Sequence, residues 1–136
     1  MTQEDKELLL KDLCARLPYG VKVEYKGEKY DVLGIAHERL VLCKPFMSYT
    51  LDECPLIEEV KPYLFPPSSI TEEQRIEFRK IMDIVEAKFV NACCKGGFTL
   101  SFTSLNDWLN KNHVDYRGLI GKGLALDATG LNLYLI

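Results

Sequence analysis

The sequence predicts a single domain of the α+β class. Two long segments carry apolar side chains at helical spacing, and between them runs a segment in which apolar and polar residues alternate as in short antiparallel strands. The chain has 136 residues, the size of one typical domain, so we treat residues 1–136 as one unit. We expect an N-terminal helix, a small antiparallel meander, a long central helix packed across it, and a C-terminal helix-loop-strand unit.

The first helix is expected over residues 2–17. Thr2 is a suitable N-cap, and acidic residues lie early in the segment whereas Arg16 lies late, which suits the helix dipole. Asp12 and Arg16 form an i,i+4 pair of favourable order. Pro18 then ends the helix. The apolar face is predicted to comprise Leu9, Leu10, Leu13, Cys14 and Leu17.

Three short strands are expected next. Residues 21–25 alternate in polarity, a tight turn at Lys26 and Gly27 follows, and residues 30–35 form the returning strand. Gly34 marks a bulge in that strand. The apolar run RLVLC supplies a third strand. The segment therefore predicts a small antiparallel meander. An SH3-like curl is one form it can take, but three strands do not establish closure.

The middle of the chain is rich in proline. Five of the six prolines lie within residues 44–69, so we expect no long regular element there. Residues 56–60 form either a short strand or a helical turn. The connector that follows is expected to be ordered, because Tyr63, Leu64 and Phe65 are too apolar for a free linker.

The long central helix is expected over residues 71–92. Thr71 and Gln74 form a capping-box pattern at its start, and Gly96-Gly97 ends it. The wide apolar face predicts burial on more than one side. Its members are Phe78, Ile81, Met82, Val85 and Phe89, widened by Ile76, Ile84 and Val90.

The C-terminal unit is expected to begin with a strand at residues 98–102. Ser104 starts a short helix that ends near residues 110–112. Residues 116–126 are expected to form a helix-turn or a loop, and residues 131–136 resemble a final strand.

Composition restricts the class of protein. The chain is 47% apolar and 27% charged, and a formal net charge of −3 without a basic run disfavours nonspecific nucleic-acid binding. Apolar runs of roughly 20 residues, which membrane spans need, are missing, and the acidic N-terminus does not resemble a signal peptide. We therefore expect a cytoplasmic protein without a membrane partner.

The five cysteines are odd in number and irregularly spaced, which predicts unbridged and mostly buried thiols in a reducing compartment. A metal site built from Cys93, Cys94 and His113 is conceivable, but the spacing is not that of a zinc site. We expect no metal and no cofactor. Cys93 and Cys94 also lie at the end of a helix, where the dipole disfavours a reactive thiolate, so no catalytic residue is predicted.

The best candidate for a ligand-binding site is the segment HVDYRGLIGK. It combines acceptor, titratable and cationic groups in His113, Asp115, Tyr116, Arg117 and Lys122. Arg117 can clamp a carboxylate or phosphate through two parallel hydrogen bonds. Alternatively, Asp115 holds Arg117 or His113 in place as an internal brace. The sequence leaves both interpretations open.

Two motifs resemble a known group of proteins. They are KPYLFPPSSITEEQ at residues 61–74 and DWLNKNHVDYRGLIGKGLALDA at residues 107–128. The pair resembles small uncharacterised proteins of gut Bacteroidetes phages and prophages, which carry KPYLxPxSSxTEE and DWLNxxHxDYRGLIxxGLA. The resemblance implies a mobile-element context in a bacterial host cell, where small single-domain proteins are more often regulators than enzymes.

These observations favour a non-enzymatic accessory or regulatory protein that binds a protein partner. The absence of a complete catalytic or metal-binding pattern in the sequence carries this hypothesis. The alternative is a small ligand- or nucleic-acid-binding module that uses Arg117, Lys122 and Tyr116. An enzyme of unknown type is the least favoured class.

Overall fold

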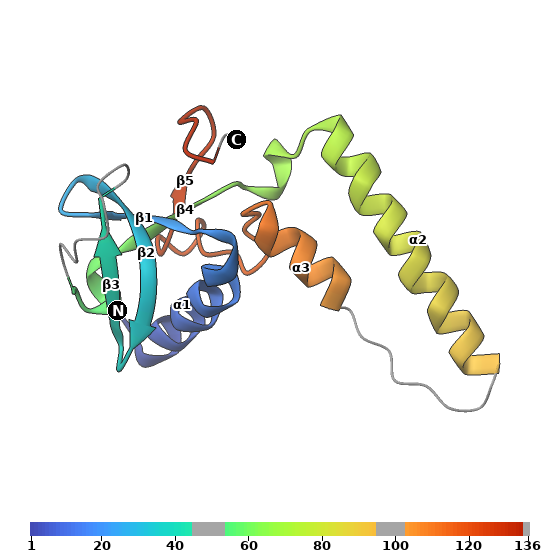
Figure 1. Cartoon of the computed structure of the whole chain (residues 1–136), viewed down its shortest axis with the longest axis horizontal. Coiled ribbons are helices and arrows are strands. Elements are labelled where there is room, and N and C mark those ends of the chain that lie inside the picture. The colour runs from blue at the N-terminus through green and yellow to red at the C-terminus, as the bar shows by residue number, and fades with distance from the viewer. Residues whose placement is uncertain (45–53, 95–102, 135–136) are drawn as a thin grey trace.

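The computed structural model describes residues 1–44, 54–94 and 103–134, without the side chains of residues 85–94 and 103. Within these ranges the chain is α+β, as predicted, with a five-stranded sheet of order β3-β2-β1-β4-β5 (Figure 1). The elements are α1 (Gln3–Arg16), β1 (Lys22–Tyr25), β2 (Glu28–Ala36), β3 (Arg39–Cys43), β4 (Lys61–Leu64), α2 (Glu72–Cys94), α3 (Thr103–Lys111) and β5 (Leu126–Asp127). Short 3-10 helices lie at Leu17–Tyr19, Ile57–Glu59 and Pro67–Ser69.

Helix α1 begins where its sequence predicts. Thr2 is the N-cap, and its hydroxyl accepts a hydrogen bond from the Asp5 backbone N–H at 3.1 Å. The buried face differs from the predicted one, because Cys14 is exposed whereas Asp12 and Arg16 are completely buried. The helix is turned so that this charged pair faces the C-terminal half of the chain, which supplies its further partners.

The antiparallel meander is confirmed. Strands β1 and β2 join through a turn in which Lys26 and Gly27 both have left-handed φ angles, and the β2–β3 register shifts between Val32 and Gly34, at the predicted bulge. Strand β4 extends the sheet by pairing antiparallel with β1, and β5 pairs parallel with β4. The first residues of the ordered connector, Lys61–Leu64, therefore form a strand of the sheet.

Two predicted C-terminal strands have different outcomes. The prediction for residues 98–102, like the Gly96-Gly97 helix stop, lies outside the described residues. The prediction of a strand from residue 131 is wrong over residues 131–134, which form turns. Gly130 and Asn132 have φ angles of +79° and +54°, and such left-handed residues interrupt an extended strand. The strand lies earlier instead, at β5.

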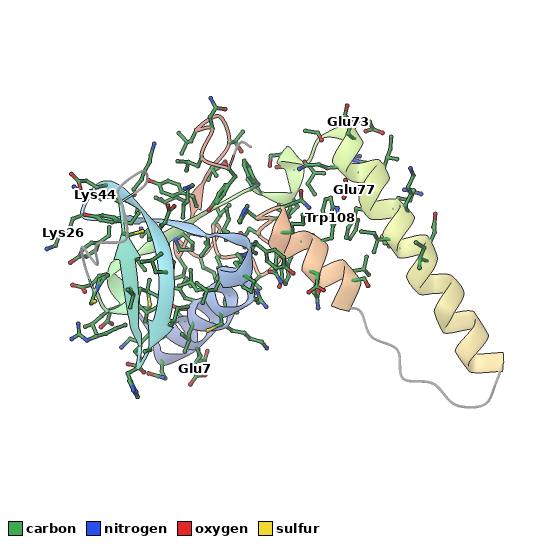
Figure 2. All side chains as sticks on the ribbon, in the orientation of Figure 1. Glu7, Lys26, Lys44, Glu73, Glu77 and Trp108 are labelled. Atoms are coloured by element: carbon green, nitrogen blue, oxygen red, sulfur yellow. The ribbon has the colours of Figure 1, made fainter. Side chains whose placement is uncertain are left out.

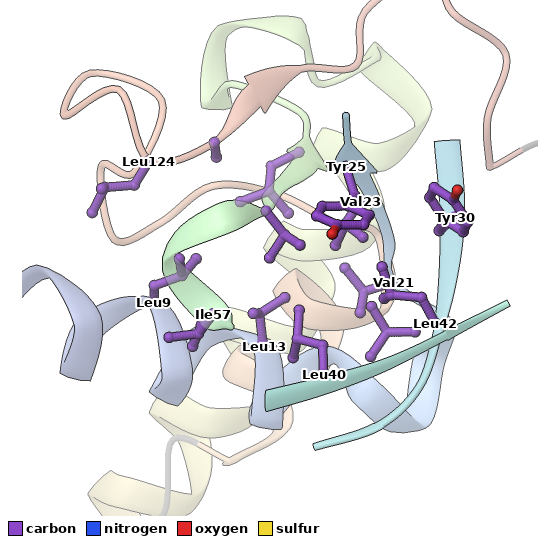
Figure 3. Close-up of a cluster of buried hydrophobic side chains, with 14 of the residues drawn as sticks. Leu9, Leu13, Val21, Val23, Tyr25, Tyr30, Leu40, Leu42, Ile57 and Leu124 are labelled. Atoms are coloured by element: carbon purple, nitrogen blue, oxygen red, sulfur yellow. The ribbon is translucent and has the colours of Figure 1, made fainter. Parts of the chain in front are cut away.

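The hydrophobic core lies between α1 and the sheet (Figure 3). Residues of the C-terminal turns join it and lie among the side chains of α1 and of the 3-10 helix at Ile57–Glu59. Its completely buried members include Leu9 and Leu13 of α1, Val21, Val23, Leu40 and Leu42 of the meander, and Leu64 and Leu119.

Helix α2 does not pack across the sheet, which corrects our expectation. Figure 1 shows it extending from the body as an arm, and its neighbour is α3. The helix starts as predicted, since Thr71 and Gln74 cap each other through hydrogen bonds of 3.0 and 3.2 Å. The sheet does not need α2 as cover, because α1 and apolar residues between 119 and 125 fill the core.

Candidate functional site

The two motifs that carry the resemblance lie against each other. Phe65 N–H donates to the His113 carbonyl and Asp115 N–H donates to the Phe65 carbonyl, both at 2.8 Å. Next to the paired strands β4 and β5, the Ala128 N–H donates to the Leu64 carbonyl at 2.8 Å. The candidate residues therefore lie at a junction between the connector and the C-terminal turns, close to the start of the arm.

Asp115 fastens the turn in which it lies. Its side chain is buried, and its carboxylate accepts hydrogen bonds from the backbone N–H groups of Leu119 and Ile120, both at 2.9 Å. A carboxylate that accepts two amide hydrogen bonds stabilises the loop that follows it. Both oxygens are thus used internally, and Asp115 is not the residue that holds Arg117.

Arg117 is an internal brace whose partner is Asp12. Its Nη1 lies 2.7 Å from Asp12 Oδ1, which joins the C-terminal turn to α1. Asp12 also accepts from Arg16, at 2.9 Å from Nε and 3.1 Å from Nη2. The side chains of Asp12 and Arg16 are completely buried, and that of Arg117 is 15% exposed. In a network with so little water contact, removing one partner leaves the others as uncompensated buried charges.

Arg16 extends this network to the backbone of the candidate segment. Its Nη2 donates to the Val114 carbonyl at 2.6 Å, whereas its buried Nη1 has no hydrogen-bond partner in the described part of the chain. The guanidinium of Arg16 lies 5.4 Å from the centre of the Tyr116 ring and that of Arg117 lies 4.5 Å from it. Tyr116 is therefore flanked by two cations, an arrangement that its ring stabilises.

The hydroxyl of Tyr116 is also used internally. It donates to the side-chain carbonyl of Asn110, at the end of α3, at a distance of 3.0 Å. Asn110 is buried, so this bond satisfies a polar group that water does not reach. Tyr116 thus connects α3 to the Arg16–Arg117 network.

His113 is buried and electrically neutral at neutral pH. Its ring stacks on that of Tyr134 with a centroid distance of 3.7 Å, and its Nδ1 has no hydrogen-bond partner among the described residues. Burial, aided by the nearby charges of Arg16 and Lys22, lowers the pKa of His113 to about 4. The φ angle of His113 is +57°, a conformation that histidine adopts more readily than most residues.

Lys122 is separate from the other four candidates. It is exposed on a turn between Gly121 and Gly123, whereas the side chains of His113 and Asp115 are buried. The five predicted residues therefore share one segment but do not converge on an open site. Whether any of them binds a ligand stays a prediction.

A small pocket lies beside this segment. Its volume is about 160 Å³, and it is bordered by Phe65, Val114 and the start of α2, with Ser69, Ile70, Thr71, Gln74 and Asn112 completing the wall. Several of its polar side chains are paired: Ser69 with the Pro66 carbonyl and Thr71 with Gln74. Part of the polar lining of the pocket is therefore engaged within the chain.

Three residues that contact the candidate segment lie outside the predicted site. Asp12 and Arg16 were predicted as a helix pair, and their spacing gave no sign that both are buried. Tyr134 lay in a segment expected to be a strand, and its contact with His113 has no sequence signal. Only the tertiary structure brings residues so far apart in the chain together.

The described residues contain no group of three or more His, Cys, Asp or Glu side chains that could hold a metal ion. Cys14 and Cys54 are exposed and Cys43 is buried, so the expectation of mostly buried thiols is wrong for these three. The described helices do not combine the length and apolar character needed to cross a membrane.

Comparison with protein-family models, with curated proteins and with solved structures finds no match for this chain.

Proposed function

We propose that this chain is a non-enzymatic accessory or regulatory binding protein that acts through protein–protein contacts made by α2. The single observation that carries the proposal is the exposure of apolar side chains on this arm. Ile76 is 50% exposed, Met82 47% and Ile84 56%. Ile76 and Ile84 lie within about a quarter turn of each other around the helix axis. Exposed apolar side chains placed in this way suit an interaction surface.

Among the residues that the structure describes, α3 is the main neighbour of α2. The Phe78 and Trp108 rings lie 5.1 Å apart, and the Trp108 indole N–H donates to Glu77 at 2.9 Å, as Figure 2 shows for the latter pair. Ile76 and Ile84 lie about two helical turns apart, with Lys80 between them in the sequence. This stripe suits a partner that offers an apolar groove with an acidic rim.

The mobile-element context is part of the proposal. It rests on the resemblance of residues 61–74 and 107–128 to small proteins of gut Bacteroidetes phages and prophages. The proposed location, the cytoplasm of a bacterial host, follows from this context. The alternative, a ligand- or nucleic-acid-binding module, gains no support from the geometry, because Arg117 and Tyr116 are engaged in internal contacts.

Photo-crosslinking in living cells tests the proposal. A benzophenone amino acid replaces Ile84 in one variant and Leu33 in the other, since Leu33 is a 47% exposed apolar residue on β2 and serves as the matched control. We expect a discrete adduct with a protein partner from position 84 and none from position 33. Ile84→Glu should then abolish recovery of that partner while the melting temperature stays unchanged. Equal crosslinking from both positions would contradict the proposal.

A further inference from the structure

The hydroxyl of Tyr134 lies where strands β1 and β4 separate. These strands pair at Val23 with Pro62 and at Glu24 with Lys61, so Lys22 and Tyr63 would form the next pair. At that place the Tyr134 hydroxyl accepts from the Lys22 N–H at 2.9 Å and donates to the Tyr63 carbonyl at 2.8 Å. One phenol thus takes the place of a direct link between the two strands.

The ring of Tyr134 is held by two other rings. It stacks on His113 at 3.7 Å with an interplanar angle of 17°, and it lies edge-on to Phe65 at 6.0 Å. Burial raises the pKa of the Tyr134 hydroxyl, so the group keeps its proton and can donate to the carbonyl of Tyr63.

The segment that carries Tyr134 has few other attachments to the body. Residues 129–134 form turns without a strand or helix, and Leu131 is 43% exposed. The hydrogen bonds of Thr129 and Leu131 are local, to Asp127 and Ala128. In the described part of the chain, the hydrogen bonds from residues 129–134 to β1 and β4 all come from Tyr134.

We propose that residues 129–134 form a strap that Tyr134 latches onto the sheet, and that protonation of His113 opens this strap as a unit. Opening exposes the Lys22 N–H and the Tyr63 carbonyl at the split between β1 and β4. The opening of the strap does not involve α2, so this proposal is tested independently of the proposed binding surface.

The charges around His113 explain why its protonation would open the strap. Arg16 on α1 and Lys22 on β1 both raise the cost of a further positive charge there, and Tyr134 on the strap stays neutral. Asp115, in the segment of His113 itself, is committed to two backbone amides. An imidazolium in this position is therefore both desolvated and repelled, and lifting the strap returns it to water.

Native-state hydrogen exchange, read by NMR for the Lys22 and Leu13 amides, tests the proposal. Lys22 N–H is protected by Tyr134, whereas the Leu13 amide lies within α1. We expect the opening constant of Lys22 to exceed that of Leu13 at least tenfold at pH 7, as for a sub-global opening. The opening constant of the Lys22 amide should rise on the order of fifty-fold between pH 7 and pH 4.5. Equal opening constants for the two amides would overturn the strap.

Two variants separate the latch from the switch. Tyr134→Phe keeps the ring but removes the hydroxyl, so it should increase the opening constant of Lys22 tenfold or more while that of Leu13 changes little. His113→Asn tolerates the left-handed φ and stays neutral, so the opening constant of Lys22 should no longer depend on pH between 6.5 and 4. Unaltered pH dependence in His113→Asn would refute the role of His113.

Discussion

The body of this protein, which comprises α1, the sheet and the C-terminal turns, buries charged side chains. Its arm, α2, exposes apolar ones. Asp12 and Arg16 are completely inaccessible, and Ile76 and Ile84 on α2 are half exposed or more. The difference lies in the available partners. Arg117 and the Val114 carbonyl add hydrogen bonds to the buried pair, whereas α3 is the main neighbour of the arm in the described part of the chain.

The comparison shows that residue type alone does not decide burial. A carboxylate can enter the interior when cationic donors surround it, because each oxygen then keeps its hydrogen bonds. An apolar face can stay in water when nothing in the same chain covers it. The first case makes a brace, and the second leaves a surface that a partner can cover.

The largest effect is expected from Asp12→Ala. This change leaves Arg16 and Arg117 without their shared counter-charge, and removing one partner of a buried ion pair costs about 3–5 kcal/mol. Urea unfolding followed by circular dichroism measures the loss. A loss below about 1 kcal/mol would show that the buried network does not hold the body together.

An exposed ion pair is the matched control for Asp12. Glu58 lies 3.1 Å from Lys6, but its side chain is 37% exposed. Glu58→Ala should change the free energy of unfolding by less than about 1 kcal/mol, since surface pairs are screened by water. Equal losses from the two variants would remove the distinction between buried and exposed charge.

The next effect is a loss of stability in acid caused by His113. Its folded-state pKa of about 4 lies below the ordinary value of 6.5, so the unfolded chain binds the proton more readily. The contribution of neutral His113 to the free energy of unfolding is therefore present above pH 6.5. As the pH drops toward 4, the free energy of unfolding falls by about 3 kcal/mol. Urea unfolding at several pH values between 7.5 and 4.5 measures the slope, and His113→Asn should remove most of it. A wild-type slope that this variant leaves unchanged would contradict the assignment.

The smallest effect is expected on the arm. Ile84→Glu places a charge where the side chain is already 56% exposed, so the free energy of unfolding should stay within about 0.5 kcal/mol of the wild type. Thermal unfolding by circular dichroism provides the measurement. A large loss would show that Ile84 is covered by another part of the chain, and the contrast between body and arm would fail.

Local patterns predicted most elements of the fold. The capping residues Thr2 and Thr71 start α1 and α2, and the Lys26-Gly27 turn and the Gly34 bulge shape the meander. These signals act over a few residues, and so the sequence displays them directly. The position of α2 depends instead on competition for the sheet face, which α1 and the C-terminal turns occupy.

The contacts of the candidate residues were not predictable from the sequence. His113, Asp115, Tyr116 and Arg117 do lie in one segment, but their side chains serve structural contacts. The partner of Arg117 is 105 positions away in the chain, and that of His113 lies in a segment of turns. Pairings over such separations leave no local pattern in a single sequence.

The free energy of unfolding of Arg117→Ala, measured beside Lys122→Ala, tests the central claim most directly. Both are cations of the same segment, but Arg117 contacts Asp12 and Lys122 is exposed. We predict that Arg117→Ala loses about 1–3 kcal/mol and that Lys122→Ala changes by less than about 0.5 kcal/mol. If Arg117→Ala is as stable as the wild type, then Arg117 is not a brace, and the contrast between body and arm is wrong.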